Sequence, residues 1–203
     1  MTADAFSDLV LMAVCAVLAW RSLGREQPHA GIGVACVLIG AAALLGVFRF
    51  SEWDSINATV KGAHQFASLV AAVGAFPIWA LSLAHPLSPI TAKLAGAGWV
   101  SFVAAGLGVA VVVLGFKPWQ QVVPLLCGLW IAHTVMVRWQ GARRWRGVAG
   151  VLCLFGSFAA ALLIPTPTTQ VLGLFNKTQL LHYLLAAALL LTCLRFRPAN
   201  SSH

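Results

Sequence analysis

The chain of 203 residues is 60% hydrophobic and only 9% charged, with a mean hydropathy of +0.88. Soluble domains carry about 25% charged residues, so this composition excludes a soluble globular protein and predicts a single transmembrane domain over residues 1–203, embedded in a lipid bilayer. The formal net charge of +8 does not indicate a nucleic-acid partner, because the cations stand in short stretches between apolar runs.

Seven apolar stretches are long enough for transmembrane helices, which need about 20 residues each. In chain order they cover residues 6–22, 31–50, 60–84, 91–115, 120–138, 147–164 and 177–195. Their length and their lack of polar alternation favour helices over barrel strands, so we expect an all-α bundle of seven membrane helices. No cation precedes the first stretch, which predicts a retained helix rather than a secretory signal peptide.

Threading these helices through a membrane distributes the cations unequally between its two faces. Nine of the 13 Lys and Arg residues fall on one face, where the run 138–146 is the densest group, and four fall on the other. Cations in short loops stay on the cytoplasmic side. We therefore expect a multi-pass protein of the cell inner (plasma) membrane, with the N-terminus outside and the C-terminus cytoplasmic. The polar stretch 51–59 and the segment 165–178 then lie outside.

The second and sixth stretches open alike, which indicates an internal repeat. Residues 33–38 (GVACVL) match residues 147–152 (GVAGVL) at five of six positions, and His64 and His182 follow at comparable separations. Residues 1–84 and 120–203 then correspond as two parallel three-helix units, with the helix 91–115 as their connector. Chance similarity between alanine- and leucine-rich helices is the alternative.

This plan of three, one and three helices resembles the SWEET sugar transporters, the PQ-loop proteins and the KDEL-receptor group. The substrates of that group do not carry over, because no Pro-Gln dipeptide marks a helix kink and histidines, His64 and His182, replace the asparagines of the SWEET pattern. A second resemblance, to the alkaline ceramidase-like hydrolases, rests on Ser51, Asp54 and the same histidines. It implies a zinc enzyme, although Ala186 replaces the second histidine of the HxxxH pair in that group.

Polar side chains gather near the outer ends of the third and seventh predicted helices. His64 and His182 each stand about one turn inside a helix, where the partial positive charge of the helix start favours neutral imidazole. We predict a polar pocket here that binds a ligand through six residues: Glu52, Asp54, His64, Asn176, Gln179 and His182. The two imidazoles with Glu52 and Asp54 also form a four-ligand set for Zn²⁺, and the histidine pair alone suits a haem. A polar cap without a ligand is the structural alternative.

Three functions stay open from the sequence. The first is a transporter or binding protein for a small polar or cationic solute, in which one helix triplet rocks against the other. The second is a metal-dependent membrane hydrolase that acts on a lipid or amide at the outer interface. The third is a structural membrane subunit with no site. Assembly as a homo-oligomer is open for each of them.

Overall fold

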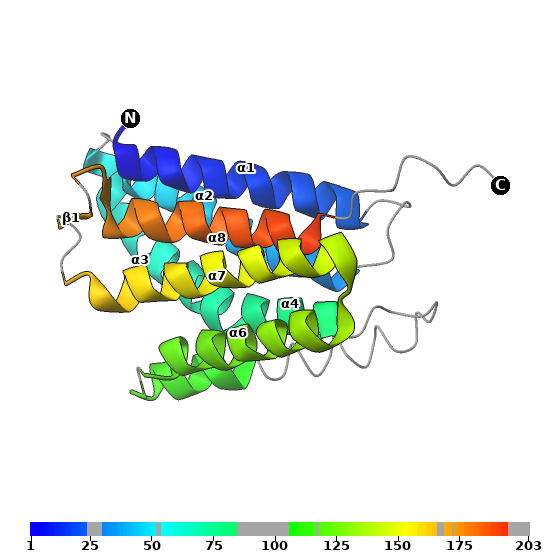
Figure 1. Cartoon of the computed structure of the whole chain (residues 1–203). Coiled ribbons are helices and arrows are strands. Elements are labelled where there is room, and N and C mark those ends of the chain that lie inside the picture. Colours follow the sequence, from blue (N-terminus) through cyan, green and yellow to red (C-terminus); the bar gives the residue numbers. More distant parts are fainter. Residues whose placement is uncertain are drawn as a thin grey trace.

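The computed structural model describes residues 1–23, 30–51, 54–84, 106–116, 118–165, 169–171 and 173–194, with the backbone alone for 54–59. Figure 1 shows a bundle of roughly parallel and antiparallel helices. They are α1 (Ala3–Leu23), α2 (Ala30–Arg49), α3 (Asp54–Val70), the π-helix η1 (Ala71–Ala75), α4 (Phe76–Ala84), α6 (Trp119–Arg138), α7 (Gly141–Leu163) and α8 (Lys177–Cys193). Two short antiparallel strands, β1 (Gln170–Val171) and β2 (Phe175–Asn176), precede α8.

Five helical segments are long and apolar enough to cross a membrane. They are Ala3–Leu23, Ala30–Arg49, Val60–Ala84, Trp119–Arg138 and Gly141–Leu163, and they confirm the predicted helices 6–22, 31–50, 60–84, 120–138 and 147–164. The helix predicted at 177–195 is present as α8, an apolar helix of 17 residues. Of the predicted helix 91–115, residues 91–105 lie outside the described residues, and 106–113 are helical.

Two of the predicted interhelical stretches are largely helical. The polar stretch 51–59 already becomes α3 at Asp54, and the run 138–146 becomes α7 at Gly141. Only Trp139 and Gln140 separate α6 from α7, both with extended backbone. The apolar pattern does not include these first turns, because they consist of polar residues. Polar side chains that lie beyond the lipid stay hydrated, so the helix can continue through them.

The helices contact one another in chain order and close into a ring. Helix α1 packs on α2, α2 on α3 and α4, α4 on α6, α6 on α7, α7 on α8, and α8 again on α1. Small residues allow close approach where these contacts are tightest. A Cβ at Gly150 of α7 would lie 2.7 Å from the Thr192 Cγ2 atom of α8. The fully buried side chains that fill the interior include Leu18, Trp79, Ile131, Leu154 and Leu189.

The third membrane-crossing segment contains a local change of helical geometry. Residues Ala71–Ala75 form one π-helical turn between α3 and α4. Pro77 follows this turn and has no N–H to donate to the carbonyl of Val73, which interrupts the α-helical hydrogen-bond ladder here. Single π-turns inside helices recur at functional sites. Ala71 and Ala72 from this turn line the cavity described below.

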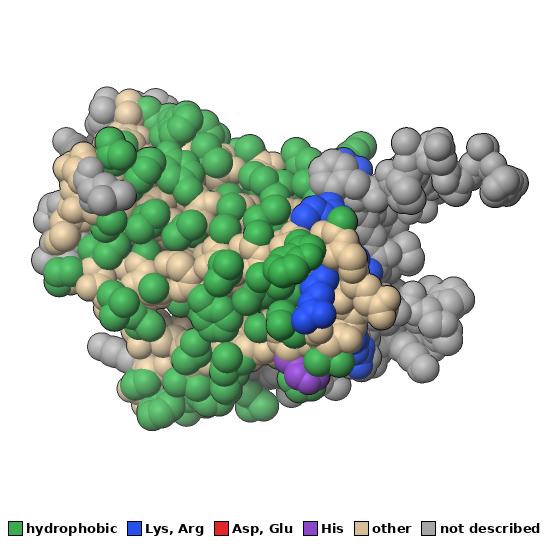
Figure 2. All heavy atoms as spheres, in the orientation of Figure 1, with side chains coloured by type: hydrophobic (Ala, Val, Ile, Leu, Met, Phe, Trp, Pro, Cys, Tyr) green, Lys and Arg blue, Asp and Glu red, His purple; other side chains and the backbone are tan. Residues whose placement is uncertain are grey.

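The two ends of the bundle differ in charge. We call the end where α1, α3, α6 and α8 begin the acidic end, since the described acidic residues Asp4, Asp8 and Asp54 lie in the first two turns of their helices there, together with the cations Arg49, Lys61 and Lys177. We call the opposite end the arginine end. Its described cations are Arg21, Arg138, Arg143, Arg144 and Arg146. Figure 2 shows blue side chains gathered at one end of a surface that is otherwise mostly apolar.

Candidate functional site

A cavity of about 550 Å³ lies inside the helix ring at the acidic end. Every membrane-crossing segment and α8 contribute to its wall. Its charged and imidazole side chains are Asp4, Asp8, Arg49, His64, Lys177 and His182. Deeper in the bundle, the wall becomes apolar and includes Leu11, Ile39, Phe76 and Leu185. A cavity of this size, with few polar groups on a mostly apolar wall, is typical of a small-molecule site.

Asp8 is the most deeply buried charged side chain among the described residues of this cavity, with 1% of its surface exposed. It lies in the second turn of α1 and faces His182 of α8. Its Oδ1 atom is 3.3 Å from His182 Nδ1, an ion-pair distance. Neither oxygen of Asp8 has a hydrogen-bond partner among the described residues. The contact with His182 is therefore electrostatic rather than a well-aligned hydrogen bond.

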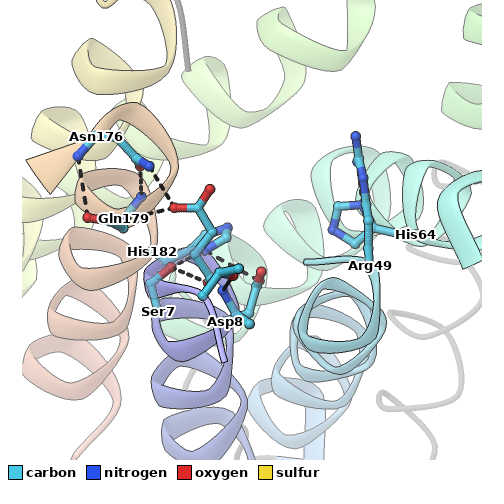
Figure 3. Close-up of polar contacts among 10 residues, drawn as sticks. Ser7, Asp8, Arg49, His64, Asn176, Gln179 and His182 are labelled. Carbon is cyan, nitrogen blue, oxygen red and sulfur yellow. Dashed lines mark hydrogen bonds and ion pairs between the residues drawn. The ribbon is translucent and has the colours of Figure 1, made fainter. Parts of the chain in front are cut away.

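The hydrogen bonds of Ser7 determine the tautomer of neutral His182. The Ser7 hydroxyl donates to the backbone carbonyl of Asp4 at 2.8 Å and also lies 3.2 Å from His182 Nδ1. Because its single hydrogen is already used, the hydroxyl oxygen accepts from Nδ1–H. In neutral His182, Nε2 is then the bare nitrogen, and no described residue bonds to it. Figure 3 shows Ser7, Asp8 and His182 converging between α1 and α8.

Gly46 of α2 provides the space that the Asp8 carboxylate occupies. A Cβ at position 46 would lie 2.5 Å from both Asp8 Cγ and Oδ2, and 2.6 Å from Oδ1. A side chain at position 46 would force the Asp8 carboxylate to move, so glycine is required for this arrangement. The carboxylate therefore lies against bare backbone on one side and an imidazole on the other.

His64 is held by the end of α2. Arg49 Nη1 lies 2.8 Å from His64 Nδ1, and the Phe50 ring packs edge-on to the imidazole with 5.8 Å between centroids. Guanidinium only donates, so Nδ1 of His64 accepts and the proton of the neutral ring is on Nε2. His64 and His182 thus have opposite tautomers. Figure 3 shows the Arg49–His64 pair apart from the group around Asp8.

Asn176 and Gln179 form the cap of α8. The Asn176 side chain accepts from the Gln179 backbone N–H at 3.0 Å, and the Gln179 side chain accepts from the Asn176 backbone N–H at 3.4 Å. Asp4 Oδ1 of α1 in turn accepts from Asn176 Nδ2 at 2.6 Å and from Gln179 Nε2 at 2.8 Å. These contacts fasten the start of α1 to the start of α8. Neither amide is among the residues that line the cavity.

The six predicted ligand-binding residues therefore have different locations. His64 and His182 both line the cavity, and Asn176 and Gln179 lie beside it in the cap. Asp54 begins α3, but its side chain lies outside the described part of the chain. Glu52 lies outside the described residues entirely. The metal set of His64, His182, Asp54 and Glu52 is thus described only for its histidines. Across the described ranges, no group of three or more His, Cys, Asp or Glu side chains is arranged to hold a metal ion.

The sequence interpretation did not include Asp4 and Asp8 in the site, although both line the cavity. A signal for Asp8 existed, because it lies inside the predicted helix 6–22 and an ionisable residue within a membrane helix is a functional candidate. A signal for the cap also existed, since Asn176 and Gln179 have the spacing of a capping box. No family model, curated protein or solved structure matches this chain.

Proposed function

We propose that this protein is a membrane transporter or binding protein for a small cationic solute, with Asp8 as the counter-ion of the bound cation. The observation that carries the proposal is the burial of the Asp8 carboxylate at 1% exposure without a hydrogen-bond partner among the described residues. A buried ionic group is stable only when a compensating charge or hydrogen bonds accompany it. A positively charged solute in the adjoining cavity supplies both.

The other cavity groups fit a ligand of this class. His182 Nε2, as the bare nitrogen of the ring, accepts a hydrogen bond from an ammonium or amidinium N–H. His64 Nε2–H and the remaining N–H groups of Arg49 are donors for a polar oxygen elsewhere on the solute. The apolar floor around Phe76 and Leu185 suits a compact hydrocarbon body.

Transport requires an orientation in the membrane and a conformational change. The acidic end is the outer face and the arginine end the cytoplasmic face of an inner membrane, in agreement with the tendency of cations to stay inside. Seven helices cross it, with 91–115 as connector, and the units 1–84 and 120–203 rock against each other around the cavity as in the SWEET-like plan. The cavity then faces outward in the described state.

Ligand-dependent stabilisation of the purified protein tests this function. The probes are choline and its uncharged carbon isostere 3,3-dimethyl-1-butanol, followed by other alkylammonium ions with matched neutral alcohols. A bound cation at 100 times its Kd should stabilise the fold by about 2.7 kcal/mol. Asp8→Asn and His182→Gln should remove the effect.

The matched control is His133→Gln, because His133 lies exposed on α6 and does not line the cavity. This variant should keep the stabilisation seen in the wild type. Stabilisation by the neutral isostere alone, or equal stabilisation of wild type and Asp8→Asn, would contradict the role of Asp8 as the counter-ion.

A further inference from the structure

Asp8 also needs a neutralising partner whenever no solute occupies the cavity. Its carboxylate is 1% exposed and no described residue gives either oxygen a hydrogen bond. An ionised carboxylate that has lost its water and gained no donor is strongly disfavoured inside a membrane protein. A compensating positive charge or a proton is therefore required in the solute-free state.

The other charged groups of the cavity make their hydrogen bonds elsewhere, and none of those described contacts the Asp8 carboxylate. On its own helix, Asp4 accepts from the amides of the α8 cap. On α2, Arg49 donates to His64 of α3, and no ion pair joins it to Asp8 among the described residues. On α8, Lys177 Nζ donates to the backbone carbonyl of Ile164 at 3.1 Å, at the end of α7.

The remaining walls of the cavity add no cation beyond Arg49 and Lys177 among the described residues. The described lining residues of α6 and α7 are uncharged, with Gln121 and Ser157 as examples. His182 is then the one described titratable group within ion-pair distance of Asp8. The Nδ1–H of His182 is directed at Ser7. An extra proton on the pair is therefore bound either by the Asp8 carboxyl or by His182 Nε2.

We infer that Asp8 and His182 form a proton-binding site that holds one proton when the cavity is empty, and that a cationic solute displaces this proton. The proton-binding site is inferred from the geometry of the pair, and the displacement of the proton by a solute rests on the proposed function. On binding, the proton leaves the pair for water and the Asp8 carboxylate becomes the counter-ion of the solute. The charge of the cavity is unchanged, so the protein exchanges one proton for one monovalent solute cation.

The surroundings of the carboxylate favour a proton over a metal cation. Hard metal ions take about six or more oxygen ligands in proteins. Asp8 is bordered by the Gly46 backbone on one side and by an imidazole nitrogen on the other, neither of which supplies an oxygen side chain. The Ser7 hydroxyl is occupied by the Asp4 carbonyl and by His182.

The proton site is tested first without any solute. Infrared difference spectra of wild type against Asp8→Asn at neutral pH report a protonated carboxyl, and ¹⁵N spectra of wild type against His182→Gln report an imidazolium. We expect one of these two signals, with its loss in the corresponding variant. An ionised Asp8 together with a neutral His182 in the solute-free protein would overturn the inference.

The exchange is tested next by proton release in weakly buffered detergent solution. Addition of a cation that stabilises the protein should release one proton per cation bound. The apparent affinity should fall tenfold for each pH unit below the titration of the pair, because one proton competes with one cation. Asp8→Asn should release no proton, and the control His133→Gln should release as many as wild type.

The outcomes separate the two claims. A cation that binds at Asp8 without proton release overturns the exchange and leaves the proposed function intact. Stabilisation by Na⁺ or K⁺ alone, lost in Asp8→Asn, shows a metal-ion site in place of the proton site. If no cation binds, the proposed function fails, and the solute-free spectra still decide whether the pair holds a proton.

Discussion

The Asp8 carboxylate of α1 lies directly against the backbone of Gly46 on α2. A methyl group at Gly46 would come within 2.5 Å of the carboxyl carbon. This contact places an acidic group inside a helix bundle at a point where only glycine leaves room for it. Because Arg49 follows Gly46 by one helical turn, the same face of α2 positions both the space for Asp8 and the partner of His64.

Gly46→Ala should displace the Asp8 carboxylate and weaken the fold. Overpacking of this kind costs about 1–3 kcal/mol, and the cation-dependent stabilisation should be lost with it. The matched control is Gly62→Ala on α3, where a Cβ would meet no described atom within 4 Å. That change should be neutral or stabilise by up to about 1 kcal/mol, through helix propensity. Thermal unfolding in detergent measures the stability of each variant. Equal stability of Gly46→Ala and Gly62→Ala would contradict a close contact between Gly46 and Asp8.

Asp4→Ala should loosen the junction of α1 and α8. It removes the acceptor of the Asn176 and Gln179 amides and leaves two donors without a partner, at a cost of about 1–3 kcal/mol. Asp4→Asn keeps one acceptor oxygen and should recover part of the loss. The free energy of unfolding from denaturant titration distinguishes the variants. If Asp4→Ala and Asp4→Asn lose the same free energy, the charge rather than the hydrogen bonds holds the junction.

Cysteine labelling in intact cells tests the orientation. In a variant without the five native cysteines, Ser55→Cys near the start of α3 should react with a membrane-impermeant thiol reagent. Ala142→Cys, exposed near the start of α7 at the arginine end, should react only after the membrane is opened. The reason is the excess of cations at the arginine end. The reverse labelling pattern would place the cavity on the cytoplasmic face.

Removal of divalent metal should leave the protein unchanged. His64 Nδ1 already accepts from Arg49, whose positive charge repels a dication, and His182 Nδ1 faces Ser7 and Asp8. We expect less than one Zn²⁺ per chain after dialysis and no shift of the unfolding temperature with chelator. Metal analysis of the purified protein gives the ratio. One tightly bound Zn²⁺ that disappears in His64→Ala would support the hydrolase instead.

Much of the architecture follows from the order of residues alone. Long apolar runs have to form helices in lipid, because their backbone groups have no other partners there, and this is why five predicted helices agree with the structure. The first turns of α3 and α7 were missed because they lie in polar sequence, outside the apolar window. The apolar pattern also predicted that His64 and His182 lie near the starts of their helices. Alternate crossing of the membrane by successive helices then placed both histidines at the same end of the bundle.

The partners of those histidines depended on the tertiary structure. The sequence predicted that Glu52 and Asp54 reach either histidine, and that prediction falls on side chains outside the described part of the chain. The structure adds two partners that the sequence order does not indicate: Asp8 reaches His182 from the far end of the chain, and Arg49 reaches His64 from the preceding helix. Hydropathy and helical period specify which residues are buried along one helix, not which neighbouring helix they face. That choice depends on close packing between helices, and here the bare backbone of Gly46 decides where the carboxylate lies.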